Sequence, residues 1–105
     1  MEIIVNENKI KLEIANTFLK KLKGFMFKRN IDYCIRFKTN SIHTFFMKEP
    51  IDVVMTDKNN KVLYIFKNIK KNKIIIKKNV YFTYEFPNNF INNLNIGNKL
   101  IIKRK

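Results

Sequence analysis

Short apolar runs separated by polar segments recur along the whole chain, and this pattern most constrains its fold. In the run 9–14, every second residue is apolar, which is the period of a strand with one buried face. The longest unbroken apolar runs, such as 62–66, fall far short of the ~20 residues that a membrane-spanning helix needs. The pattern therefore predicts a soluble, strand-rich domain.

The expected strands are 2–5, 9–14, 33–37, 43–47, 51–56, 61–66, 74–76, 80–86 and 99–103. The turn Asp57-Lys58-Asn59-Asn60 joins two of them into a hairpin, because Asp and Asn tolerate tight-turn geometry. The strands do not alternate with long helices, which argues against a doubly wound parallel sheet. We expect a mainly β (α+β) fold, a compact, barrel-like and mostly antiparallel sheet of about eight short strands.

Two short helices are expected beside this sheet. In the first, apolar residues recur at helical spacing between a cap at Asn16 or Thr17 and a stop at Gly24. The second begins with Pro87, whose fixed φ suits the first helical position, and ends at Gly97. Its many Asn residues make it a weak helix.

One domain spanning residues 1–105 is the simplest organisation. The chain has only two Gly and two Pro, and no flexible linker rich in these residues divides it. The N-terminus lacks the basic, apolar and small-residue segments of a signal peptide, so we expect a cytoplasmic protein.

The single Cys and the single His exclude several kinds of site. Cys34 cannot form a disulfide within the chain, and Cys34 and His43 together cannot supply a structural zinc site. With two glycines, the chain also lacks a Gly-rich phosphate loop. We therefore expect no metal and no cofactor, and we expect Cys34 to be a buried, inert thiol.

The net charge of +14 favours polyanions, either nucleic acid or an anionic surface. Lysines are densest between Lys67 and Lys78. An alternative origin of this charge is the base composition of the genome, because Lys, Asn, Ile, Phe and Tyr are abundant and use codons made largely of A and T. The charge alone does not separate a functional basic face from an ordinary solvated one.

The most distinctive stretch is 43–54, in which an aromatic-Met-Lys segment precedes a hydrophobic strand containing Asp52. The block 23–29 is similar to a Gly-Leu-Met-x-x-Arg signature, and 84–87 to a Leu-Glu-hydrophobic segment. A fourth block, the turn at 96–99, is similar to a closing Gly-Asp turn. Together these blocks resemble the uncharacterised bacterial and archaeal family called domain of unknown function 192, whose members form compact β-dominated domains without a settled activity.

The polar or soft residues within these blocks form the candidate pocket: Arg29, His43, Met47, Lys48, Asp52 and Glu85. Each also has a purely structural interpretation. Met47 would fill the core, Asp52 would cap the turn after Pro50, and Glu85 would pair with Arg29 or a Lys to offset its burial.

Three functions remain open at this point. The first is a non-enzymatic accessory or binding domain whose pocket takes a small ligand or a protein segment. The second is binding of nucleic acid or an anionic surface through the basic face. The third is an enzyme acting on a small substrate through His43, Asp52 and Glu85, which requires the three side chains within hydrogen-bond reach. Ser41 and His43, two apart on a strand, share a face, but no triad acid or oxyanion hole can be assigned to them.

Overall fold

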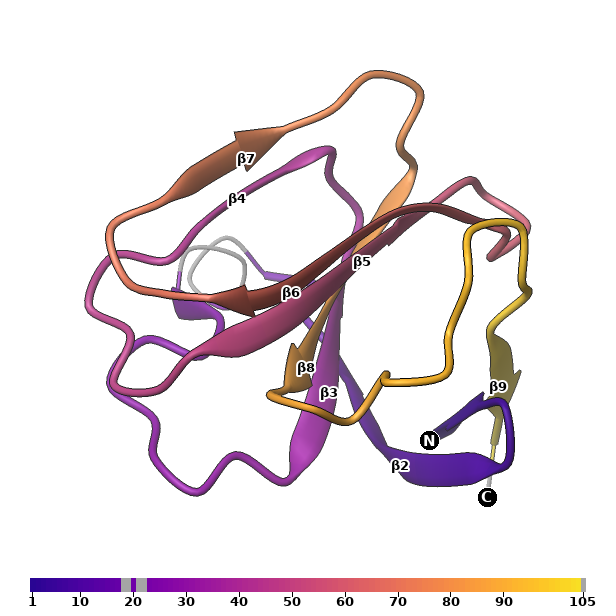
Figure 1. Cartoon of the computed structure of the whole chain (residues 1–105), viewed down its shortest axis with the longest axis horizontal. Helices are drawn as coiled ribbons and strands as arrows, with labels where there is room; N and C mark the ends of the chain where they lie inside the picture. The colour runs from indigo at the N-terminus through magenta and orange to yellow at the C-terminus, as the bar shows by residue number, and fades with distance from the viewer. Residues whose placement is uncertain (18–19, 21–22, 105) are drawn as a thin grey trace.

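The chain folds into two β-sheets in a computed structural model that describes all residues except 18–19, 21–22 and 105 (Figure 1). The strands are β1 (Glu2–Val5), β2 (Asn8–Ile14), β3 (Tyr33–Phe37), β4 (Ser41–His43), β5 (Ile51–Thr56), β6 (Val62–Ile69), β7 (Ile74–Ile76), β8 (Phe82–Pro87) and β9 (Ile101–Lys103). No helix among the described residues is long and apolar enough to cross a bilayer.

Seven strands form one mixed sheet in the order β6-β5-β8-β3-β2-β1-β9. Neighbouring strands run antiparallel except β2 and β3, which are parallel with Leu12 opposite Cys34. The sheet curls into a half-barrel, and its two ends meet where the Val62 N–H donates to the Asn98 carbonyl at 2.8 Å. The expected mainly β, barrel-like fold is therefore confirmed, with one parallel pair in the sheet.

Both faces of the large sheet are covered, because side chains alternate between two hydrophobic clusters. Cys34, Val54 and Phe86 belong to the first cluster, whereas Ile35 and Val53 belong to the second. All six residues of β5 are buried as a result. Burial also raises the pKa of the Cys34 thiol well above its usual range, as expected for an inert cysteine.

β4 and β7 form a separate antiparallel ribbon with Ile42 opposite Ile75 (Figure 1). Ile42 is buried in the second cluster and Ile75 packs against it, so the ribbon covers that face of the large sheet. The expected strand at 43–47 is wrong in its position. The strand is Ser41–His43, and the chain turns after it, with the Met47 N–H donating to the Thr44 carbonyl at 3.3 Å.

The expected pair of short helices is not borne out. Part of the first lies outside the described residues, although the Thr17 hydroxyl accepts the Lys20 N–H at 3.2 Å and Gly24 has a φ of +48°. The second is wrong. Pro87 is the last residue of β8, and Asn89 follows in the left-handed conformation (φ +70°), which interrupts a right-handed helix.

Asparagine occupies most of the left-handed backbone positions among the described residues of this glycine-poor chain. Of the nine non-glycine residues with positive φ among the described residues, seven are Asn. Asn tolerates the left-handed conformation better than other side chains do. The predicted hairpin is an example and is confirmed, since Asn60 is left-handed and Asp57 Oδ1 accepts the N–H groups of Asn59 and Lys61. The other two left-handed residues are Phe27 and Phe46.

Candidate functional site

Glu85 lies on β8 and points into the second hydrophobic face, beside Ile35 and Val53. Its side chain is 2% exposed, and burial raises its pKa from 4.5 to about 8. The N–H of Phe25 donates to Oε1 at 3.3 Å, which lowers the pKa against the larger effect of burial. The carboxyl group is therefore mainly protonated at neutral pH.

No ion pair joins Glu85 to Arg29 or to any other described residue. The expectation that a cation offsets the burial of Glu85 is thus wrong for the described residues. A surface pair needs little desolvation, whereas a buried pair must remove two charges from water. Protonation is the less costly way to accommodate a carboxyl group at this depth.

Gly24 lies directly against this carboxyl group. A Cβ atom at position 24 would be 2.8 Å from Glu85 Oε1 and 3.2 Å from Cζ of Phe37. The residue also has a φ of +48°, which disfavours any L side chain. Two independent constraints therefore favour glycine here.

Replacing Gly24 with Ala should lower the free energy of unfolding by about 2 to 3 kcal/mol, combining backbone strain with the close contact to Glu85. Gly97→Ala is the matched control, since Gly97 also has positive φ (+93°) but an alanine methyl group there would have no atom within 4 Å. It should cost about 1 kcal/mol. Urea denaturation of both variants measures the difference. Equal costs, or an excess for Gly24→Ala that persists undiminished in a Glu85→Ala background, would show that the carboxyl contact is unimportant.

A pocket of about 450 Å³ opens beside Glu85, between the large sheet and the β4–β7 ribbon. Its lining residues are Lys23, Gly24, Phe37, Thr39, Ser41, Ile42, His43, Phe45, Ile74, Ile76 and Glu85. Most of its wall is apolar, and its titratable groups are Lys23, His43 and Glu85. The ring of His43 stacks on Phe45 at 5.2 Å, and its Nδ1 accepts the Phe45 N–H at 3.2 Å. This bond places the proton of a neutral imidazole on Nε2.

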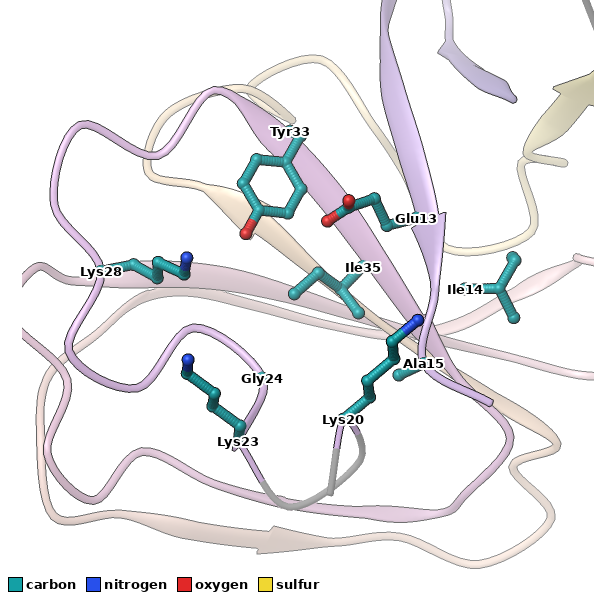
Figure 2. A pocket seen from close by; sticks show the side chains of 9 residues that line it. All are labelled: Glu13, Ile14, Ala15, Lys20, Lys23, Gly24, Lys28, Tyr33 and Ile35. Carbon is teal, nitrogen blue, oxygen red and sulfur yellow. The ribbon is translucent and has the colours of Figure 1, made fainter. Parts of the chain in front are cut away.

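A second pocket, of about 330 Å³, lies on the other side of the Gly24 turn (Figure 2). Lys23 and Gly24 border both pockets. The Tyr33 hydroxyl points to the side of this pocket that carries the Lys28 amino group. Burial, followed by the negative charge of Glu13, raises the pKa of Tyr33, so its hydroxyl keeps its proton. This second pocket is more polar and contains none of the residues expected from the sequence.

Of the six sequence-predicted residues, His43 and Glu85 line the pocket beside Glu85, and the other four do not. Met47 is buried in the second cluster, which agrees with its interpretation as core filler. Lys48 is exposed and borders a shallow hollow with Lys70 and Lys71, and Arg29 is exposed.

Asp52 lies on the opposite face of the sheet from Glu85. It pairs in register with Phe86, whereas Val53 pairs with Glu85, and successive strand residues face opposite sides. Its carboxylate accepts the N–H of Asn68 at 2.8 Å and that of Asn89 at 2.9 Å. The expected cap on the turn after Pro50 is therefore wrong, and Asp52 does not join His43 and Glu85 in a cleft.

The sequence did not predict four other residues that line the pocket beside Glu85: Phe37, Thr39, Ile74 and Ile76. No local signal could have found the isoleucines, because β7 reaches the pocket only by pairing with β4. Gly24 did carry a signal, since it lies in one of the blocks that resemble a known family and is one of only two glycines.

Comparison with known proteins decides the family. The model of the DUF192 family, described as uncharacterized ACR, matches residues 1–102. This chain belongs to the DUF192 family. The blocks that carried the resemblance meet in space: Glu85 of one contacts Gly24 and Phe25 of another, and His43 of a third borders the same pocket.

Relatives of this DUF192 chain have names without a stated activity. The UPF0127 protein TK1120 of Thermococcus kodakarensis is 34% identical, over 90% of this chain and 68% of its own length. A UPF0127 protein of Thermococcus gammatolerans is 31% identical, over 90% of this chain and 69% of its own length.

Solved structures share the fold. A protein of unknown function from Novosphingobium aromaticivorans superposes with a TM-score of 0.82 at 14% identity, covering 96% of this chain and 82% of the other. A Sinorhizobium meliloti protein proposed to be a transcription regulator gives 0.81 at 16% identity, covering 95% and 89%. At these identities the likeness concerns the fold alone.

Proposed function

We propose that this chain is a binding domain for a small, mainly apolar ligand that carries one neutral hydrogen-bond acceptor, such as a carbonyl group. The ligand would occupy the pocket beside Glu85. The observation that carries this proposal is a buried, protonated carboxyl group at the edge of an apolar pocket, with no cation paired to it among the described residues.

The size and the lining of the pocket suit such a ligand. Its volume of about 450 Å³ falls within the usual range for small-molecule sites. Phe37, Ile42 and Ile74 supply apolar contact, and a few polar groups at defined places would orient the ligand.

The protonation state of Glu85 selects the polar group of the ligand. A protonated carboxyl group donates one hydrogen bond, so it can hold a carbonyl oxygen. A charged amine would instead have to ionise Glu85 and bury an ion pair, which costs desolvation of both charges. We therefore favour a neutral acceptor over a cation.

The placement of Asp52 argues against the enzyme that the sequence left open. That reaction would need Asp52, His43 and Glu85 within hydrogen-bond reach, and Asp52 is engaged on the other face of the sheet. Binding without chemistry uses only the groups that line the pocket.

Titration with benzamide, followed by amide NMR of the ¹⁵N-labelled protein, tests the proposal. We expect benzamide to shift the Gly24 and Phe25 resonances, because the Phe25 N–H donates to Glu85. Its affinity should fall as the pH rises through about 8, where Glu85 loses its proton. Glu85→Gln keeps a donor and should bind at all pH values, and Ile96→Ser, on an exposed residue outside the pocket, should behave like the parent protein.

Benzylamine, of similar size but cationic, is the competing probe. Tighter binding of benzylamine, with affinity that rises with pH, would contradict a neutral acceptor while keeping the pocket. No shift with either probe at millimolar concentration would contradict the pocket itself.

A further inference from the structure

Phe27 and Phe46 form an exposed aromatic pair. Their rings stack at 5.5 Å, and the Phe27 N–H donates to the Phe46 carbonyl at 3.0 Å. Their side chains are 58% and 61% exposed, and both residues have positive φ (+64° and +63°). For a bulky side chain this backbone conformation is an unfavourable outlier.

Nothing within the described fold compensates for that conformation by burying these rings. The other positive-φ positions among the described residues hold Asn or Gly, which tolerate this conformation. An observed outlier at exposed aromatic residues is a reason to look for a function. Phe45 directly precedes Phe46 in the chain, and it lines the Glu85 pocket together with exposed Ile74 and Ile76.

Basic residues lie close in the chain to the residues of this apolar patch. Thr44 fixes the connection between β6 and β7 beside it, since its hydroxyl donates to the Lys70 carbonyl and accepts the Lys73 N–H, each at 2.8 Å. The β4–β5 and β6–β7 connections lie on the side of the molecule away from β9 (Figure 1). The exposed cations of these segments and of the segment after Phe27 are Lys28, Arg29, Lys48, Lys70, Lys71 and Lys73.

Negative charge is nearly absent from the same segments. Glu49 is the single acidic residue within 27–29, 44–49 and 70–73. Its carboxylate is engaged by the N–H groups of Asn30 and Ile31. Exposed apolar side chains with cations close to them in the chain match the boundary between the acyl chains and the anionic head groups of a bilayer.

We propose that this face, formed by Phe27, Phe45, Phe46, Ile74 and Ile76 with the cations close to them in the chain, docks on an anionic lipid bilayer. Single-stranded nucleic acid would also use aromatic rings and cations. The exposed isoleucines favour the bilayer, because an aliphatic side chain cannot stack on a base but can enter the lipid interface. The face shares Phe45, Ile74 and Ile76 with the wall of the Glu85 pocket, but the proposal does not require a ligand in that pocket.

Co-sedimentation with large unilamellar vesicles tests the proposal. We expect the protein to bind vesicles of two parts phosphatidylcholine to one part phosphatidylserine at about 0.15 M salt, and to bind pure phosphatidylcholine at least tenfold more weakly. Equal binding to both vesicles, or binding to neither, would overturn the proposal.

Two sets of variants separate the apolar and the basic parts. Phe27→Asn with Phe46→Asn should remain folded, because Asn suits both backbone conformations, yet should lose at least tenfold in vesicle affinity. Lys48→Gln, Lys70→Gln and Lys71→Gln together should lose about 100-fold. The matched controls are Ile96→Asn and the triple change Lys9→Gln, Lys58→Gln and Lys99→Gln, on exposed residues outside the face.

Losses of the same size in the controls would reduce the interaction to net charge and would overturn the assignment of this face. A parallel titration with single-stranded oligothymidylate distinguishes the other partner. Binding of the oligonucleotide that is lost in the two Asn substitutions, without any effect of those substitutions on vesicles, would assign the face to nucleic acid instead.

Discussion

Replacing Glu85 with Gln is expected to abolish a loss of stability that the parent protein shows between about pH 5 and pH 8. The pKa of this carboxyl group is raised from 4.5 to about 8 in the folded chain by burial. At about 1.4 kcal/mol per pH unit, that difference corresponds to roughly 5 kcal/mol over the whole window.

The direction follows from proton binding. Below about pH 4.5, Glu85 is protonated in both the folded and the unfolded chain. As the pH rises toward 8, the unfolded chain releases its proton and the folded chain does not, so the unfolded state gains stability. Above about pH 8 both states are ionised, and the full penalty for a buried carboxylate is present.

Urea denaturation of the parent protein and of Glu85→Gln at several pH values measures this effect. Other titrating groups are common to both proteins, so their contributions cancel in the difference between the two curves. Glu7→Gln, the same change on an exposed turn, is the matched control. Stability curves that run parallel for the parent protein and Glu85→Gln would contradict the buried, protonated carboxyl group on which the proposed ligand site depends.

Replacing Asp52 with Ala should destabilise the fold by roughly 3 kcal/mol. Asp52 is 1% exposed and accepts two backbone N–H groups, from Asn68 and Asn89. Hydrogen bonds to charged groups contribute about 1.5 to 3 kcal/mol each, and their loss leaves two donors poorly satisfied. Asp52→Asn should recover part of the loss, because its single carbonyl oxygen can satisfy one donor well.

Asp57 provides a matched control for this prediction. It also accepts two N–H groups, from Asn59 and Lys61, but in an exposed hairpin turn where water can replace it. Asp57→Ala should therefore cost about 1 kcal/mol or less. Thermal or urea denaturation compares the two changes. Equal costs would mean that Asp52 does not tie the ends of β6 and β8 together as its contacts indicate.

Local pattern was sufficient where neighbouring residues decide the structure. Alternating apolar residues predicted most of the strands, and the Asp57 turn predicted the β5–β6 hairpin, because both leave a pattern in residues close in the chain. The prediction of the second helix failed because of a contact between residues far apart in the chain. Asn89 adopts a left-handed conformation while its N–H binds Asp52, 37 residues away.

The candidate site was predicted only in part. His43 and Glu85 were identified from the family blocks, and the structure brings both to one pocket. Asp52 was grouped with them because sequence spacing alone does not show which face of a sheet a residue occupies. That assignment requires the pairing register of the neighbouring strands. Phe27 and Phe46 carried no signal, since nothing in a sequence marks a phenylalanine as left-handed.

The amino-acid sequence by itself determined a β-rich fold, its family, the absence of a disulfide within the chain and the excess of positive charge. The tertiary structure alone decided that β2 and β3 run parallel, that the β4–β7 ribbon covers one sheet face and that Glu85 meets Gly24. Each of these depends on contacts between distant segments. Such contacts form because burying both faces of the curled sheet is favourable, and no short stretch of sequence encodes them.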